Sequence, residues 1–173
     1  MSDNFDVISF RAPSTYPGDL TRPNAPFTAE PGIGLASNPP TQFGNPVALD
    51  ASTGHYRPIG AGDTAANIAG AVLRSFPTQS ATYPNPTTFG GTGVNAGALN
   101  ILKDGYIAVN VYGSAAPVKG GAVYVGTVAN AGHSAVGAIS AASDTTNSFV
   151  WLGAQFTGGI DANGNSEIHF RVQ

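Results

Sequence analysis

Apolar and polar residues alternate along several short stretches of this chain, a pattern that predicts β-strands. Between residues 106 and 112, Ile107, Val109 and Val111 fall on one face, and Tyr106, Asn110 and Tyr112 fall on the other. The segment 166–172 repeats this alternation up to the end of the chain. Further strands are expected at 46–50, 56–59, 67–74, 122–128, 135–140 and 148–156. Short strands at such spacing predict an all-β fold, a sandwich or barrel.

Dipeptides that favour tight reversals lie between some of these strands. Asp104-Gly105 and Asn163-Gly164 tolerate the positive φ angles of two-residue turns, so each is predicted to form a hairpin. A single helical turn is expected near residues 64–68. The fold is therefore predicted to rest on strand pairing.

Proline dominates the first quarter of the chain and changes the prediction there. Eight of the 13 prolines lie at or before Pro46, and none follows Pro117. Proline lacks an N–H and restricts the residue before it, so residues 12–42 are predicted to form neither a helix nor a central strand. We therefore divide the chain into an extended arm, residues 1–42, and a β-domain, residues 43–173.

The arm carries bulky apolar residues that a solvated linker would lack. They favour an arm that becomes ordered on a partner protein; a disordered terminal tail is the alternative. The predicted contact residues of the arm are Phe5, Phe10, Tyr16, Leu20, Phe27, Ile33 and Leu35.

A second segment with predicted contacts is the long irregular stretch at residues 77–98. Loops longer than about 12 to 15 residues are usually functional or disordered. Tyr83 and Phe89 favour a loop that contacts a partner.

Charge and cysteine content exclude several classes of protein. Charged residues make up 10% of the chain, against about 25% in an average soluble domain. The seven Lys and Arg residues are scattered, so nucleic-acid binding is not expected. No apolar run is long enough to span a membrane, and no signal peptide is recognisable, which predicts synthesis in the cytoplasm. Without cysteine, the chain has neither disulfides nor thiolate chemistry.

No arrangement of residues points to catalysis, a cofactor or a metal ion. The glycine-rich segments 60–64 and 90–93 lack the Gly-Lys-Ser/Thr ending of a phosphate-binding loop and are interpreted as turns, with Asp63 bonded to nearby backbone N–H groups. Glu167 and His169 share a strand face, but no third ligand follows at a fixed spacing. We therefore expect no enzymatic activity, no cofactor and no metal site.

Several turn and strand motifs occur in an order that resembles one protein family. These are Gly44-Asn45-Pro46-Val47-Ala48-Leu49, Tyr56-Arg57-Pro58-Ile59, Gly60-Ala61-Gly62-Asp63-Thr64, Arg74-Ser75-Phe76-Pro77-Thr78, and the later segments 120–125, 152–158 and 161–168. Together they are similar to the structural cement proteins that decorate and lock the heads of tailed bacteriophages. The similarity covers about residues 43 to 173 and leaves the arm outside it.

This resemblance implies a jelly-roll-like sandwich or barrel on the exterior of a phage capsid. The implied partners are the major capsid protein and further copies of the chain itself. A carbohydrate- or receptor-binding β-module of a phage tail is the alternative. Such a module needs an exposed aromatic platform, whereas Trp151, the only tryptophan, lies in an apolar run typical of a core.

Overall fold

The fold consists almost entirely of β-strands, as the alternation predicts. The computed structural model describes residues 16–74, 98–130 and 136–172. Its elements in chain order are β1 (Thr28–Ile33), β2 (Pro46–Leu49), β3 (Tyr56–Pro58), the 3-10 helix η1 (Ala65–Asn67), β4 (Ile68–Leu73), β5 (Ala98–Tyr112), β6 (Ala122–Gly126), β7 (Ile139–Ser140), β8 (Ser148–Phe156) and β9 (Asn165–Arg171). The all-β prediction is confirmed, and β8 has the predicted bounds.

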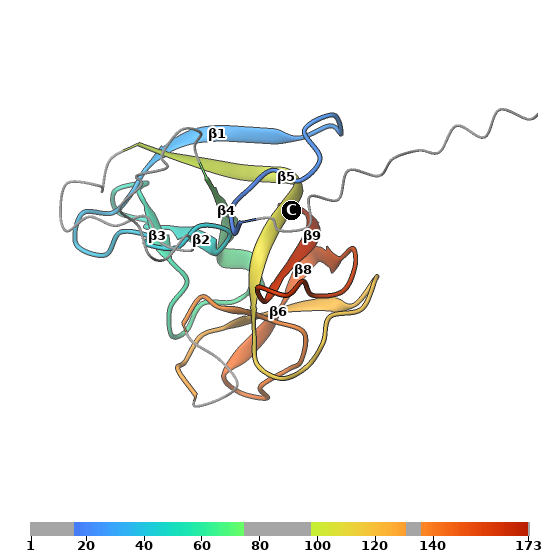
Figure 1. The fold of residues 1–173 in the computed structure, drawn as a ribbon. Coiled ribbons are helices and arrows are strands. Elements are labelled where there is room, and N and C mark those ends of the chain that lie inside the picture. The colour runs from blue at the N-terminus through green and yellow to red at the C-terminus, as the bar shows by residue number, and fades with distance from the viewer. Residues whose placement is uncertain (1–15, 75–97, 131–135, 173) are drawn as a thin grey trace, which may run out of the picture.

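Strand β5 is the element around which the others are arranged. It spans 15 residues and pairs with β1 and β4 through its first half and with β9 and β7 through its second half. Figure 1 shows the strand changing direction between these two halves. Two groups of strands are thereby built on one continuous strand.

The hairpin predicted at Asp104-Gly105 is wrong, because these residues lie inside β5. Gly105 has the positive φ that the prediction used, +140°. Here that angle bends one strand, because the residues on both sides of the bend pair with other strands and not with each other. A Cβ at Gly105 would lie 2.9 Å from the Cβ of Phe27, so only glycine fits at the bend. At Asn163-Gly164 a reversal is present and β8 pairs with β9 across it, but residues 157–164 lie between the two strands, and Gly164 has a positive φ while Asn163 does not.

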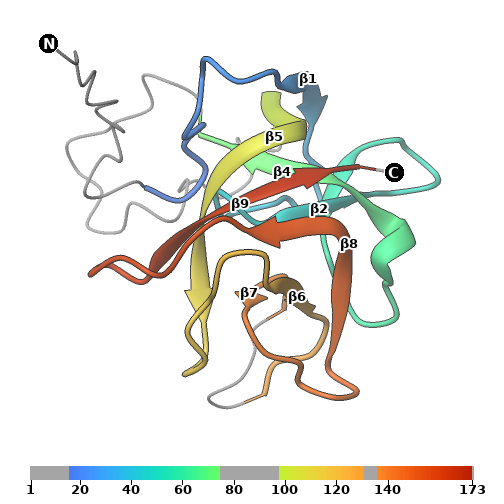
Figure 2. The ribbon, with the colours of Figure 1, turned by 90° about the vertical axis from the view of Figure 1, so that its right-hand side faces the viewer.

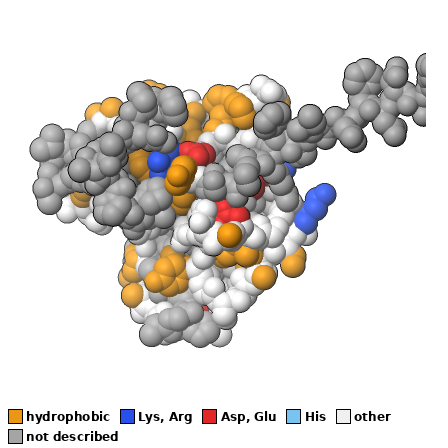
Figure 3. All heavy atoms as spheres, in the orientation of Figure 1, with side chains coloured by type: hydrophobic (Ala, Val, Ile, Leu, Met, Phe, Trp, Pro, Cys, Tyr) orange, Lys and Arg blue, Asp and Glu red, His pale blue; other side chains and the backbone are white. Residues whose placement is uncertain are grey.

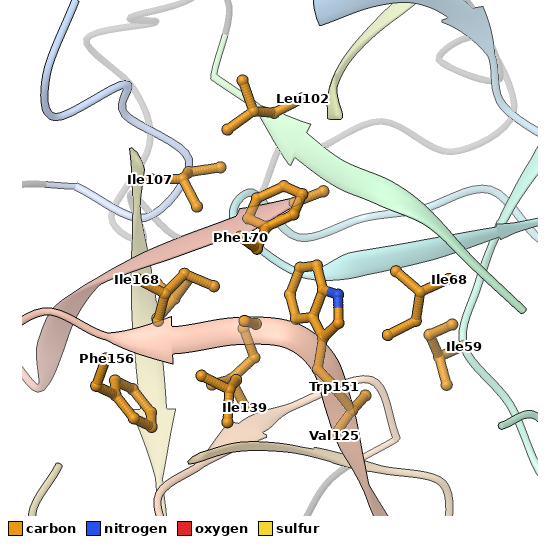
Figure 4. Packing of buried hydrophobic residues seen from close by; sticks show 14 of the residues in the cluster. Ile59, Ile68, Leu102, Ile107, Val125, Ile139, Trp151, Phe156, Ile168 and Phe170 are labelled. Carbon is orange, nitrogen blue, oxygen red and sulfur yellow. The ribbon is translucent and has the colours of Figure 1, made fainter. Parts of the chain in front are cut away.

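The second half of β5 closes a ring of five strands, which we call the C-terminal ring. Its strands pair in the order β5, β7, β6, β8, β9 and back to β5. Figure 4 shows Trp151, Phe156, Ile168 and Phe170 among the large side chains of its core. The Trp151 and Phe170 ring centroids lie 4.5 Å apart, and both residues are at most 1% exposed.

The first half of β5 belongs to a second group, the N-terminal ring. Strand β5 pairs with β4, β4 with β2, and β2 with β3; an isolated bridge between Gly34 and Tyr56 then leads to β1, which pairs with β5. Figures 1 and 2 show β1 at the top of each view and β6 and β8 lower down, with β5 running from one group of strands to the other. The smaller buried cluster that fills the N-terminal ring is Phe43, Val47, Tyr56, Ala69, Val72, Leu99 and Ile101.

Strands β2 and β4 separate the two cores, since both of their faces are buried. Val47 and Val72 belong to the core of the N-terminal ring. Ala48 and Ala71, one residue away on each strand, belong to the larger core. Because alternate residues of a strand point to opposite faces, the two rings share this layer.

The part of the predicted arm from residue 16 onward packs on the strands, contrary to our expectation. Strand β1 pairs with β5 over its whole length, and Leu20 forms a bridge with Ile107. The Gly18 N–H donates a 2.8 Å hydrogen bond to the Ala108 carbonyl. Strand β1 buries little of its own surface, so its sequence does not have to alternate between apolar and polar residues. Its proline is tolerated because only one edge of the strand is paired along its length. The functional division at residue 43 stays a prediction.

The corner between β3 and η1 is held by one carboxylate. Asp63 accepts two hydrogen bonds from Arg57, at 2.6 and 2.8 Å, and one from the Gly60 N–H at 2.7 Å. The predicted role of Asp63 in bonding the backbone is therefore confirmed. The Arg57 guanidinium, followed by the Gly60 N–H, holds the pKa of Asp63 below its ordinary value of 3.8.

Truncating Phe170 tests the core of the C-terminal ring. Phe170→Ala is expected to lower the free energy of unfolding by about 3 to 5 kcal/mol, because it leaves a cavity beside Trp151. Arg171→Ala is the matched control, with a 78% exposed side chain and an expected loss of about 0 to 1 kcal/mol. Denaturant titration of both variants measures the difference, and equal stabilities would show that Phe170 is not a core residue.

Placing a side chain at Gly32 tests whether β1 is integral to the fold. A Cβ at this position would overlap the Tyr56 ring, which is 4% exposed. Gly32→Val is expected to cost about 1 to 3 kcal/mol, with each kcal/mol lowering the melting temperature by about 2 to 4 °C. Deletion of residues 1–42 is expected to lower it further. A truncated chain that melts at the wild-type temperature would instead support an arm that is separate from the fold.

Replacing Asp63 tests the corner through pH. A carboxylate whose pKa is lowered on folding contributes stability above its unfolded-state pKa and loses it as the pH falls through the folded-state value. Asp63→Asn is therefore expected to be less stable than wild type at pH 7, by about 1.5 to 3 kcal/mol. The gap should narrow as the pH falls below about 3.8. Unfolding free energies from pH 7 to 2 measure it, and a constant gap would contradict the ionic role.

Candidate functional site

The predicted contact residues fall into three sets. Tyr16, Phe27 and Ile33 are 42%, 47% and 53% exposed. Leu20 and Leu35 are half-buried, and Leu20 packs against the larger core. Phe5, Phe10, Tyr83 and Phe89 lie outside the described residues. Three of the seven arm residues thus present apolar surface to solvent.

The three exposed side chains are carried by fixed backbone. The Arg74 guanidinium lies over the Tyr16 ring, and its central carbon is 4.9 Å from the centroid of that ring. Phe27 directly precedes β1 and contacts the bend of β5 at Gly105. Ile33 ends β1, opposite Ala98. Figure 3 shows hydrophobic side chains at the upper edge of the molecule, over the region that β1 occupies in Figure 1.

A polar cluster fastens β1 across the N-terminal ring. Glu30 accepts a hydrogen bond from the Tyr56 hydroxyl and lies 2.9 Å from the Lys103 ammonium. Lys103 also donates a 2.6 Å hydrogen bond to the Ala69 carbonyl. The Tyr56 hydroxyl and Lys103 hold the pKa of Glu30 below its ordinary value of 4.5. Residues from β1, β3, β4 and β5 are thereby joined at one point.

A second polar cluster fastens the chain ahead of β1 to the C-terminal ring. Arg22 forms two hydrogen bonds with the Glu167 carboxylate, at 2.6 and 3.2 Å, and its guanidinium lies 4.2 Å from the Tyr106 ring centroid. Thr157 donates a further hydrogen bond to Glu167. Although burial disfavours its charge, Glu167 keeps a pKa below 4.5, because Arg22 and Thr157 bond to the carboxylate.

Most charges on the described surface are already paired within the chain. Arg22, Arg57, Arg74, Lys103 and Arg171 each lie within 3.5 Å of a carboxylate oxygen. Figure 3 shows few charged side chains on the face it displays. A partner is therefore offered mainly apolar and neutral polar groups.

Glu167 and His169, which share a strand face in the sequence, are both engaged with other residues of the chain. Among the residues that the structure describes, no group of three or more His, Asp or Glu side chains lies within reach of one metal ion. Glu167 is bonded to Arg22, while His169 stacks on Tyr106, with ring centroids 4.5 Å apart. In the described part of the chain, no helix is long and apolar enough to cross a membrane.

One exposed apolar group was missed when the sequence was interpreted. Val150 and Leu152, on β8, are 37% and 56% exposed. They flank Trp151, which is 1% exposed. The signal was present in the sequence, because residues on both sides of an inward Trp in a strand must point outward.

Comparisons with known proteins show a similar fold and a family. No curated protein matches the sequence. A solved structure, "The capsid of Myoviridae Phage XM1", contains a chain with a similar fold: its TM-score is 0.68 at 18% identity, covering 99% of this chain and 98% of that one. The family model for the XM1 gp53 minor capsid protein matches residues 5–170, which include most of the predicted arm. The chain therefore belongs to the XM1 gp53 minor capsid protein family, a family of phage capsid-associated proteins.

Proposed function

We propose that this protein is a cement, or decoration, protein that binds the outer surface of the major capsid lattice and bridges neighbouring subunits. The observation that carries the proposal is the family match over residues 5–170. The surface supports it, because its charges are largely paired while Tyr16, Phe27 and Ile33 stay exposed. The proposed partners are the major capsid protein and further copies of this chain.

The proposed mechanism is stabilisation by mass action. A protein that binds the assembled lattice, and not the separated subunits, shifts the equilibrium towards the assembled state. Binding across a joint between subunits would then oppose rupture of the DNA-filled head. No chemical step is required, so the proposed role is structural and not enzymatic.

The contact residues in this proposal are the apolar residues before β2, and Tyr16, Phe27 and Ile33 supply exposed apolar area. Ile33 ends the paired strand β1 and Phe27 directly precedes that strand. Close to Tyr16, the backbone of Gly18 and Asp19 is hydrogen-bonded to Ala108. Such preorganisation lowers the entropic cost of binding, since little chain remains to be ordered at these positions. Tyr83 and Phe89 stay predicted contacts.

A receptor-binding module is the less favoured function. Stacking on a sugar requires an exposed aromatic ring, and Trp151 is 1% exposed within the core of the C-terminal ring. Its ring packs against Phe170. Binding of the protein to a glycan array would favour this alternative.

Capsid binding by a double variant tests the proposal. Phe27→Ser with Ile33→Ser is expected to weaken binding to purified capsids at least tenfold, because each buried side chain of this size contributes about 1.5 to 3 kcal/mol and about 1.4 kcal/mol corresponds to tenfold. Leu49→Ser with Tyr112→Ser is the matched control, since these side chains are 45% and 44% exposed. Occupancy is measured by co-sedimentation.

The dependence of capsid occupancy on salt concentration tests whether the contact is apolar. Wild-type occupancy is expected to stay nearly constant from about 0.05 to 1 M sodium chloride, a range in which the Debye length falls from more than 10 Å to about 3 Å. Release at moderate salt would show that charge holds the protein on the capsid. Failure of the wild-type protein to bind at any salt concentration would contradict the cement function itself.

A further inference from the structure

The outer face of β6 and β8 carries exposed apolar side chains and no charged one among its paired residues, although it points away from the core. Tyr124 and Val150 are paired across these strands, so their side chains lie on the same face. Ala122 and Gln155 form the next outward pair. Leu152 projects beside them and is 56% exposed. We call Ala122, Tyr124, Val150, Leu152 and Gln155 the β6–β8 face.

Strand β9, which pairs with β8 in the same ring, has an outward face of the kind expected in contact with water. The outward residues of β9 are Glu167, His169 and Arg171, and each has an ionisable side chain. An antiparallel sheet with one solvated face normally alternates apolar inward and polar outward residues. Strand β9 follows this rule, whereas β6 and β8 depart from it on the same ring.

A bulge in β8 interrupts this face. Between the pairs Tyr124–Val150 and Ala122–Gln155, β6 advances by two residues and β8 by five. Gly153, at φ +81°, lies in this bulge directly after Leu152. Bulges redirect side chains and commonly occur at functional positions. Leu152 lies next to this bulge and is exposed, so covering it with a partner would contribute favourable free energy.

We propose that the β6–β8 face is a second docking surface, which contacts a neutral, apolar protein surface of the capsid lattice. This inference rests on the proposed function. The face carries no charged residue, so a charged partner surface would be desolvated without compensation. Its five residues are far fewer than the roughly 20 to 30 that each partner contributes to a stable interface. A free dimer held by this face alone is therefore disfavoured, while a contact that adds to others on one lattice is favoured through effective concentration.

Paired substitutions on β8 test this docking surface. Val150→Thr with Leu152→Gln removes apolar surface while keeping a β-branched residue at position 150. The melting temperature of the free variant is expected to stay within a few degrees of wild type, whereas its apparent affinity for purified capsids is expected to fall about tenfold. Leu49→Ser, at a 45% exposed position on β2 in the N-terminal ring, is the control and is expected to bind like wild type.

Three outcomes would overturn the inference. The first is a β8 variant that binds capsids as tightly as wild type; the cement function would stand, because the wild-type protein still binds. The second is a wild-type dimer in sedimentation velocity that dissociates in the variant, which would make a second copy the occupant. The third is an equal loss of affinity in the control, which would mean that exposed apolar area matters wherever it lies. If the β8 variant does not fold, Leu152→Gln alone is measured in the same way.

Discussion

Pairing along the two halves of β5 is the constraint on which the rest of the structure depends. The bend at Gly105 sends the strand from the N-terminal ring into the C-terminal ring, so each ring is closed by the same segment of chain. Because the two rings share β5, no linker separates them. The layer of β2 and β4 also contributes side chains to both cores. The two rings are therefore expected to unfold as one cooperative unit.

The same constraint determines where contact residues are presented. Strand β1 is held by β5, by Tyr56 and by the ion pair between Glu30 and Lys103. The chain before it is held by Arg22 on Glu167. Polar side chains thus mainly bond to other parts of the chain, where they hold β1 and the segment before it, which bury little surface of their own. What remains for a partner is mainly apolar and neutral polar surface.

The fold was predicted correctly where the local sequence pattern agreed with the pairing between strands, and incorrectly where the two differed. Strict alternation predicted the inward faces of β5 and β9, including Ile107, Val109 and Phe170, and these residues are buried. Strand β1 was not predicted, because it pairs through its backbone and carries Pro31 and Gly32 without an apolar period. At Gly105 the local preference was correct but the outcome was not. The same φ allows a reversal or a bend, and the choice depends on partners distant in sequence.

The candidate site was predictable only in part, for a related reason. Bulky residues among prolines indicated Tyr16, Phe27 and Ile33, which are exposed, but the pattern did not show that Leu20 packs against a core. The outward positions of Val150 and Leu152 could have been inferred from an inward Trp151, but the bulge beside them could not, because a bulge is set by the partner strand.

Cryo-electron microscopy of the parent capsid tests the cement function most directly. The proposal predicts density for this protein on the outside of the shell, over joints between major capsid subunits, with the side chains of Phe27 and Ile33 covered. Density confined to the interior of the head, or to the tail, would contradict it.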